Sequence, residues 1–276
     1  MEYQNAGTKQ PICAEFLLGF LITIEYLNVK INREAASKIE TCFRVLKVTQ
    51  YSLLRNGTYL ATHPHFGPTI VKFAHSVAAK QQLKTEAEFL HHHASPYWPK
   101  YLDYGSDMGM DWLMLEFFES LSIDYSQLDP SLKKEITNNA EQALIALHDT
   151  GYIHGDIKPS NLIVTPCYRT ILVDMGSILP IGSSYEQQTN PSLSPMFSAL
   201  NPNLRTGKIS PQNDFFSLAI SLQTMWEHHP FSEQSLIEFI KTEKLPILGS
   251  LSSCYQILVA QQVKRARQLA LASGTE

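Results

Sequence analysis

One polar stretch near the middle of the chain constrains its fold more than any other feature: His154-Gly155-Asp156-Ile157-Lys158-Pro159-Ser160-Asn161. Two short β-prone runs follow it, at Leu162–Val164 and Ile171–Val173, and their spacing predicts a small hairpin. A second acid, Asp174, comes directly after the hairpin. Taken singly, each polar residue would be interpreted as a turn former or a loop cap. The whole set in one register is too regular for that interpretation, and it predicts a shared site.

This stretch resembles the catalytic core of the protein kinases, in which a His-x-Asp-x-Lys-x-x-Asn loop, a hairpin and an Asp-x-Gly motif follow one another. The last motif is Asp-Met-Gly at 174–176. The resemblance implies that Asp156 accepts or orients the substrate hydroxyl and that Lys158 stabilises the transferring phosphoryl group. It also implies that Asn161 and Asp174 hold Mg²⁺. Phosphoryl transfer needs such groups because catalysis depends on positioning and on neutralising the phosphate charge.

Residues expected at the nucleotide occur in the order that the family requires. Lys72 lies in the β-prone run Thr69–Phe73, as the family lysine does, and the resemblance implies that its ammonium contacts the phosphates. The acid that orients this lysine is expected on the helix predicted over Val77–His91. Glu88 is a possible choice, but Glu86 matches the family spacing Glu-Ala-x-x-Leu better.

The apolar run Trp112–Phe118 resembles the hinge that joins the two lobes of a kinase. The resemblance implies that the backbones of Glu116 and Phe118 bind the adenine of ATP. The phosphate-covering loop departs from the family pattern, because Gly57 stands where the family has three glycines. Glycine lets backbone amides approach a phosphate closely, so nucleotide affinity is weakened unless Arg55 compensates electrostatically.

Strands are predicted first and helices later, which is typical of an α+β fold. Asn-Gly at 56–57 between two β-prone runs predicts a hairpin. Asp129-Pro130 predicts the start of a helix that ends near Gly151, and another helix is predicted from Asp214, which is expected to cap it and to hold the catalytic loop. Two further helices fit near 235–242 and 252–272.

The resemblance implies a two-lobed protein kinase-like fold with a small β-rich N-lobe and a mainly helical, shortened C-lobe. The expected divisions are a partly helical N-terminal extension over 1–49, an N-lobe with its hinge over 50–118, and a C-lobe over 119–276. Two family features are replaced in the C-lobe. Gly155 stands where an arginine often precedes the catalytic Asp, so activity is expected not to depend on phosphorylation of the segment after Asp174. Leu200-Asn201 replaces the Pro-Glu whose ion pair usually anchors that segment.

Composition excludes several other classes of protein. The net charge of −4 argues against a nucleic-acid-binding protein. Four scattered cysteines without a CxxC motif indicate a reduced, cytoplasmic chain. The apolar run Phe16–Ile24 is shorter than the roughly 20 residues of a membrane span, and a packed N-terminal helix is expected there.

His91-His92-His93 is expected to cap a helix end and not to bind a metal. The oligomeric state is left open.

These observations together predict an ATP- and Mg²⁺-dependent kinase that phosphorylates Ser or Thr of a protein substrate. A small-molecule phosphotransferase of the aminoglycoside or choline type is the first alternative. Such enzymes share His-Gly-Asp with this chain, but they usually lack the lysine found here at Lys158. A nucleotide-binding pseudokinase scaffold is the second alternative, which the sparse glycine loop favours and the complete set of charged residues opposes.

Overall fold

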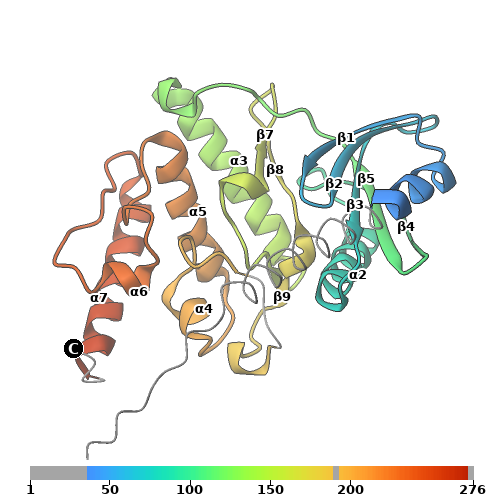
Figure 1. Cartoon of the computed structure of the whole chain (residues 1–276). Helices are drawn as coiled ribbons and strands as arrows, with labels where there is room; N and C mark the ends of the chain where they lie inside the picture. The colour runs from blue at the N-terminus through green and yellow to red at the C-terminus, as the bar shows by residue number, and fades with distance from the viewer. Residues whose placement is uncertain (1–35, 189–192, 273–276) are drawn as a thin grey trace, which may run out of the picture.

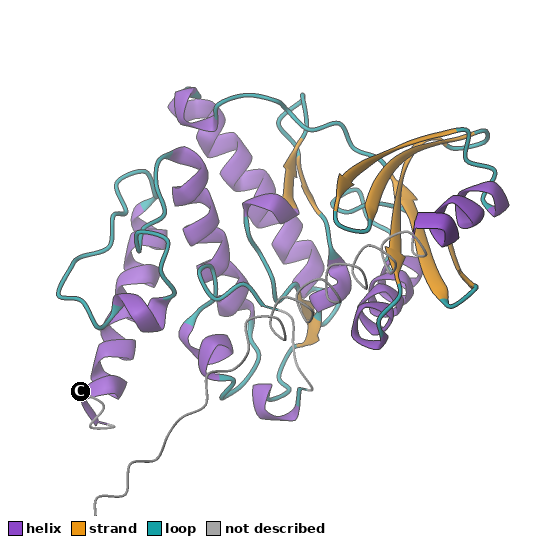
Figure 2. Ribbon diagram, in the orientation of Figure 1, coloured by secondary structure: helices purple, strands orange, loops and turns teal. Residues whose placement is uncertain are grey.

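The computed structural model describes residues 36–188 and 193–272. A sheet-rich small lobe lies beside a larger lobe that is mainly helical (Figures 1 and 2). The α+β arrangement expected from the sequence is therefore confirmed. The apolar run Phe16–Ile24 lies outside the described residues. No helix in the described part of the chain is long and apolar enough to cross a membrane.

The small lobe is built on one five-stranded antiparallel sheet, with the strands in the order β1-β2-β3-β5-β4. Its strands are β1 (Gln50–Arg55), β2 (Thr58–His63), β3 (Gly67–Ala74), β4 (Tyr101–Asp107) and β5 (Met110–Glu116). The expected hairpin at 56–57 joins β1 to β2. The sequence did not indicate β4. The hinge strand begins and ends two residues earlier than predicted, so Phe118 lies outside the sheet.

The sheet is covered on both faces, because alternate residues of a strand point to opposite sides. On one face, Met114 shares a hydrophobic cluster with Phe43 from a helix that includes residues 36–45. On the other face, Leu113 belongs to the core that includes α2 (Val77–His92). Part of the segment preceding the sheet therefore packs as a layer of the small lobe. Ser76 is the N-cap of α2, and its side chain accepts a hydrogen bond from the Ala79 N–H.

Helices make up most of the large lobe, namely α3 (Pro130–His148), α4 (Leu200–Leu204), α5 (Pro211–Trp226), α6 (Leu236–Phe239) and α7 (Ser253–Ala272). Its short strands are β6 (Tyr152–Ile153), β7 (Leu162–Val164), β8 (Thr170–Leu172) and β9 (Leu179–Pro180), and its 3₁₀ turns are η1 (Tyr125–Gln127), η2 (Pro159–Asn161), η3 (Met175–Ser177) and η4 (Tyr185–Gln187). β7 pairs with β8 as the predicted hairpin, and β6 pairs with β9. In Figure 1, α3 lies beside this hairpin, and α5 stands next to α3 on the side away from the hairpin.

Helix starts in the large lobe agree with the sequence in one case and differ in another. Asp129 caps α3 as expected, since its side chain accepts the Ser131 N–H at 2.8 Å. The prediction that Asp214 caps α5 is wrong, because the helix begins at Pro211 with Ser210 as its cap. The Ser210 N–H donates to the side chain of Asn213 at 3.0 Å, which completes a capping box. Asp214 is thereby free for another role.

Candidate active site

The loop between β6 and η2 carries the polar stretch and is fixed by Asp214 of α5. The Asp214 carboxylate accepts the backbone N–H of His154 at 2.7 Å and that of Gly155 at 3.0 Å. The His154 ring then lies 3.0 Å from the carbonyl oxygen of Val173, at the end of the hairpin. The expected role of Asp214 in holding the loop is confirmed. One buried acid thus sets the loop backbone, and His154 ties that loop to the residue before Asp174.

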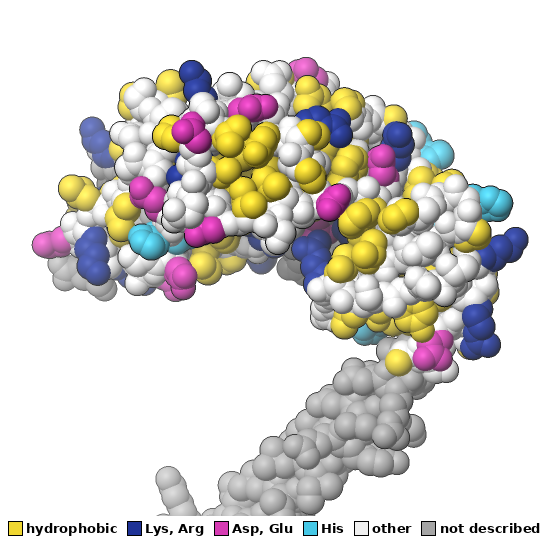
Figure 3. Space-filling model, turned by 90° about the horizontal axis from the view of Figure 1, so that it is seen from above, with side chains coloured by type: hydrophobic (Ala, Val, Ile, Leu, Met, Phe, Trp, Pro, Cys, Tyr) yellow, Lys and Arg dark blue, Asp and Glu magenta, His cyan; other side chains and the backbone are white. Residues whose placement is uncertain are grey.

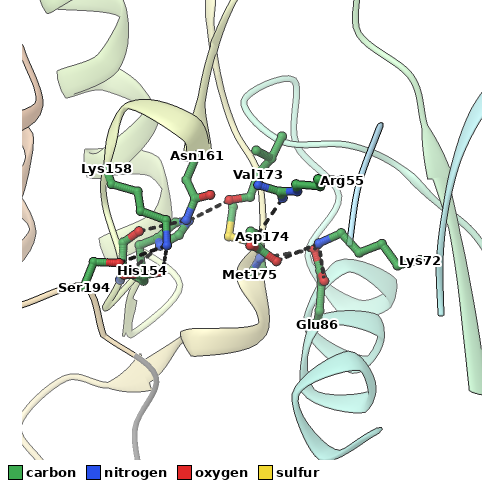
Figure 4. Close-up of polar contacts among 11 residues, drawn as sticks. Arg55, Lys72, Glu86, His154, Lys158, Asn161, Val173, Asp174, Met175 and Ser194 are labelled. Carbon is green, nitrogen blue, oxygen red and sulfur yellow. Dashed lines mark hydrogen bonds and ion pairs between the residues drawn. The ribbon is translucent and has the colours of Figure 1, made fainter. Parts of the chain in front are cut away.

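Asp156, Lys158 and Asn161 form a connected group on and just after this loop, and Figure 4 shows Lys158 and Asn161 close together there. The Lys158 ammonium donates to Oδ2 of Asp156 at 2.7 Å, and the Asn161 side-chain amide donates to the Asp156 carbonyl at 2.9 Å. Asp156 Oδ1 and Asn161 Oδ1 are buried and have no hydrogen-bond partner among the described residues. Buried acceptors are normally satisfied. These two oxygens are therefore available to groups that the protein does not supply.

A second charged group forms where α2, β3 and the end of the hairpin meet. Lys72 Nζ lies 2.8 and 2.7 Å from the two carboxylate oxygens of Glu86, and 2.7 Å from Oδ1 of Asp174. Glu86 also accepts the backbone N–H of Met175 at 3.2 Å. Met175 is fully buried in the core that α2 shares with the large lobe. This cluster therefore joins the two lobes through both charge and packing.

The electrostatics of the cluster keep Lys72 and Asp174 charged, whereas burial raises the pKa of Glu86. Burial alone would lower the pKa of the Lys72 ammonium, but Glu86 and Asp174 outweigh burial and raise it. Burial would likewise raise the pKa of Asp174, but Lys72 and Arg55 prevail and lower it to about 2. Asp174 also has a φ of 74°, a left-handed backbone that is uncommon outside glycine. The structure thus holds an ionised carboxylate at the end of the hairpin.

Residues of both groups line one cavity of about 260 Å³. Its lining includes six of the residues expected at the site: Gly57, Lys72, Glu86, Asp156, Lys158 and Asp174. The space-filling view shows a notch between the lobes with acidic and basic side chains at its edge (Figure 3). Asn161 is fully buried and not part of the lining, and the hinge residues Glu116 and Phe118 are not part of it either. The Glu116 N–H donates instead to the Lys100 carbonyl at 3.0 Å.

The β1–β2 turn closes one side of the cavity. Gly57 has a φ of 69°, and its carbonyl accepts the Phe73 N–H at 2.7 Å. A Cβ at Gly57 would lie 3.0 Å from the Phe73 carbonyl oxygen, so this glycine lets the turn lie close to β3. Arg55, the last residue of β1, places Nη2 3.4 Å from Oδ2 of Asp174. The turn that has a single glycine in place of the family's three therefore brings a cationic side chain, Arg55, into the cavity lining.

A model of the protein kinase domain matches residues 67–269 of the chain. The chain belongs to the protein kinase family. The two-lobed kinase-like fold expected from the sequence is therefore confirmed.

Curated relatives of this kinase include bacterial and animal proteins. The serine/threonine-protein kinase PknL of Mycobacterium tuberculosis is 23% identical over 141 residues, which are 49% of this chain and 35% of PknL. The serine/threonine-protein kinase YabT of Bacillus subtilis is 27% identical over 173 residues, which are 57% of this chain and 43% of YabT. The human serine/threonine-protein kinase MRCK gamma is 29% identical over 120 residues, which are 41% of this chain and 8% of the relative. The matched part therefore spans less than half the length of each of these relatives.

Two features of the kinase site were missed in the sequence. The Lys158 ammonium donates to the hydroxyl of Ser194 at 2.9 Å, although the two residues are far apart in the chain. No local pattern marks such a contact. Gly155 has a φ of 78°, and a Cβ there would lie 2.5 Å from the Ser177 carbonyl oxygen. The sequence shows only that an arginine is replaced at Gly155, whereas the structure shows that this backbone has no room for a side chain.

Of the three histidines at the end of α2, His92 makes a helix-end contact of the kind expected from the sequence. His92 Nδ1 lies 2.6 Å from the Glu88 carbonyl oxygen in the last turn of the helix. The Glu88 carboxylate is exposed and lies 3.7 Å from Lys84, so of the two acids considered for Lys72 only Glu86 contacts it. Within 36–188 and 193–272, no group of three or more His, Cys, Asp or Glu side chains is arranged to hold a metal.

Proposed function

We propose that this kinase transfers the γ-phosphoryl group of ATP to a Ser or Thr hydroxyl of a protein substrate. The observation that carries the proposal is the convergence of two charged groups on one cavity. Lys72 Nζ lies within 2.8 Å of a carboxylate oxygen of Glu86 and of Asp174, and Asp156 and Lys158 line the same cavity. Phosphoryl transfer requires cations for the phosphates and an acceptor for the hydroxyl proton, and the cavity offers both.

Asp156 and Lys158 are proposed to act on the hydroxyl and the phosphoryl group. Lys158 donates a hydrogen bond to Oδ2 of Asp156. The buried and unpartnered Oδ1 therefore remains to orient the substrate hydroxyl and to accept its proton. A bond forms between the hydroxyl oxygen and the γ-phosphorus while the bond from that phosphorus to the ADP oxygen breaks. The Lys158 ammonium balances charge on the oxygens of the group in transit.

Lys72 and Gly57 are proposed to contact the phosphates of ATP, with Glu86 holding the lysine in place. Glu116 and Phe118 are proposed to bind the adenine through their backbones, as the resemblance implies. Glu116 ends β5 beside Thr69 of β3, and Phe118 follows two residues later, which is compatible with this role.

The donor set also fits Mg²⁺. Asn161 offers a buried carboxamide oxygen without a partner, and Asp174 offers an ionised carboxylate. Hard oxygen donors are the ligands that Mg²⁺ prefers. When bound, Mg²⁺ neutralises phosphate charge, and we propose that Asn161 and Asp174 hold it.

Two observations support a protein substrate in preference to a small molecule. Lys158, which the small-molecule phosphotransferases usually lack, is present and contacts Asp156. Lys158 also donates to Ser194, so the part of the chain around Ser194 lies against the catalytic loop, where it can present a peptide chain. The names of the bacterial relatives, serine/threonine-protein kinases, support the choice of hydroxyl.

The test is incubation with γ-labelled ATP and Mg²⁺ in the presence of a generic protein substrate such as casein, with Asp156→Asn as a parallel sample. We expect the wild-type protein to label Ser or Thr, and the variant to label them about 10²- to 10⁴-fold more slowly. Acid hydrolysis of the product identifies the labelled amino acid. Absence of label with both proteins, together with thermal stabilisation by ATP, would indicate a nucleotide-binding scaffold and overturn the proposal.

A further inference from the structure

The segment from Ser194 to Ala199 adjoins the catalytic loop, and its anchor differs from the ion pair usual in the family. Leu200, at the position of the usual proline, is buried in the core. Asn203 instead places its side-chain amide 2.7 Å from the Ser198 carbonyl oxygen and 3.1 Å from that of Ala199. The Ser198 hydroxyl donates to the Ser194 carbonyl at 2.9 Å. Neutral hydrogen bonds therefore hold the end of this segment.

His229, in the turn between α5 and α6, holds the middle of the segment. Its side chain is almost fully buried. Nδ1 accepts the backbone N–H of Phe231 at 3.2 Å and that of Glu233 at 3.1 Å, and Nε2 lies 3.0 Å from the carbonyl oxygen of Met196. A backbone N–H can only donate and a carbonyl can only accept, so Nε2 carries the proton. The contacts thus specify a neutral imidazole in one tautomer.

The surroundings of His229 fix its ring as well as its proton. Phe197 packs edge-on to the ring with centroids 5.4 Å apart, and Phe231 packs from within the turn at 5.8 Å. Ser232 and Glu233 adopt left-handed backbone conformations, with φ of 52° and 62°. Burial lowers the pKa of His229, in agreement with the neutral form. A strained turn of this kind is usually retained where the surrounding structure needs it.

These contacts continue to the catalytic loop. Ser194, which accepts the Lys158 ammonium at 2.9 Å, lies two residues before Met196. The Phe197 N–H donates back to the Ser194 carbonyl at 2.9 Å, so residues 194–197 form one closed turn. A displacement of the Met196 carbonyl would move this turn, and with it the hydroxyl that Lys158 contacts.

We propose that His229 is a positioning residue that holds the turn 194–197 against the catalytic loop, in place of the family's ion pair, for the binding of the protein substrate. The link to substrate binding rests on the proposed function, whereas the anchoring of the turn does not. The hydrogen bonds of His229 all end on backbone groups, and His229 is not in the lining of the cavity that Lys72 and Asp174 share. It is therefore expected to affect the acceptor side of the reaction and not the nucleotide side.

The experiment compares His229→Phe and His229→Gln with the matched control His228→Gln, whose neighbouring side chain is exposed. Phenylalanine keeps a ring but removes the hydrogen-bond partner of three backbone groups, namely the Met196 carbonyl and the N–H groups of Phe231 and Glu233, whereas glutamine retains a donor for the Met196 carbonyl. We expect amide hydrogen exchange in 194–199 to accelerate about tenfold in His229→Phe, less in His229→Gln and not in His228→Gln. For the protein substrate, kcat/KM is expected to fall about 10- to 100-fold in His229→Phe, with KM for ATP within about twofold of the wild type.

Each outcome has a defined meaning. Exchange and protein-substrate kinetics like those of His228→Gln in both His229 variants would overturn the inference. An equal loss on the ATP and the protein side would indicate general destabilisation and also overturn it. If His229→Phe does not fold, the exchange rates of His229→Gln decide. If the wild-type protein transfers no phosphoryl group, the proposed function fails, and faster exchange confined to 194–199 still supports the anchoring role.

Discussion

The two sides of the catalytic loop are held by different chemistry. On the side of Lys72, Glu86 and Asp174, the contacts are ion pairs between charged groups in a cavity. On the side of His229 and Asn203, they are hydrogen bonds from neutral side chains to backbone carbonyls. Charged groups can exchange their partners for phosphate or a metal ion, whereas neutral groups bound to backbone have nothing to gain from such a ligand. The first side is therefore suited to bind a ligand and the second to remain in place.

Among the variants that test this contrast, removal of the Lys72 ammonium should cause the largest loss of stability. Lys72→Met leaves the buried Glu86 beside Asp174 without a cation, and breaking a buried pair in this way costs about 3 to 5 kcal/mol. Lys84→Met is the matched control, because its ion pair with Glu88 is exposed and is expected to contribute at most about 0.5 kcal/mol. Urea denaturation of both variants measures the two values. Similar losses in the two variants would show that the buried cluster does not hold the lobes together.

Gly155 lies where both sides meet, and a substitution there should have the next largest effect. Ala at Gly155 combines a left-handed φ of 78° with a Cβ 2.5 Å from the Ser177 carbonyl oxygen. We expect a loss of about 2 to 4 kcal/mol from backbone strain and overpacking. Gly182→Ala has a similar φ of 86° but open space around its Cβ, so about 1 kcal/mol is expected. Equal losses by thermal unfolding would mean that backbone strain alone requires the glycine.

The charged side could be predicted from the sequence to a large extent, because phosphoryl chemistry restricts residue type and spacing together. Lys72, Glu86, Asp156 and Asp174 were expected at one site, and the structure brings them to one cavity. Their positions depend on local patterns, namely a strand, a helix and a hairpin, which side-chain periodicity indicates. Strand β4 was missed, because Tyr101–Asp107 combines polar residues and a glycine with few branched side chains.

The neutral side could not be predicted, because its contacts end on backbone groups. Any residue at position 196 offers the same carbonyl, so no side-chain pattern marks the partner of His229. Asp214 shows the same difficulty at a smaller scale. Its place at the start of the predicted helix suggested a cap, yet Ser210 and Asn213 take that role, and of its two expected roles only the contact with the catalytic loop is found. Such roles depend on how distant segments meet, which tertiary structure decides.

Acidic pH should lower the stability that the ion pairs of the charged side contribute, over a pH range set by the pKa of Asp174. Its pKa falls from 3.8 to about 2 on folding, so the carboxylate adds stability that is complete above about pH 4 and is lost as the pH falls through about 2. The shift alone corresponds to about 2 kcal/mol, but the side chain is 39% exposed, and screening reduces the expected effect to about 1 kcal/mol. Wild-type stability in urea should therefore decline more than that of Asp174→Asn between about pH 4 and 2. Parallel declines would contradict the assignment.

Arg55 should give the smallest effect, and it tests whether the charged side exchanges partners. Its guanidinium is partly exposed and lies 3.4 Å from Asp174, within the cavity lining. If Arg55 turns to the phosphates when ATP binds, Arg55→Gln should raise the KM for ATP about threefold at low salt and less at high salt, since ions screen exposed charges. Arg44→Gln is the control, because Arg44 is exposed outside the cavity and contacts Thr41. A lower KM in Arg55→Gln would instead show that Arg55 competes for the Asp174 carboxylate, and would make the arginine a restraint on nucleotide binding.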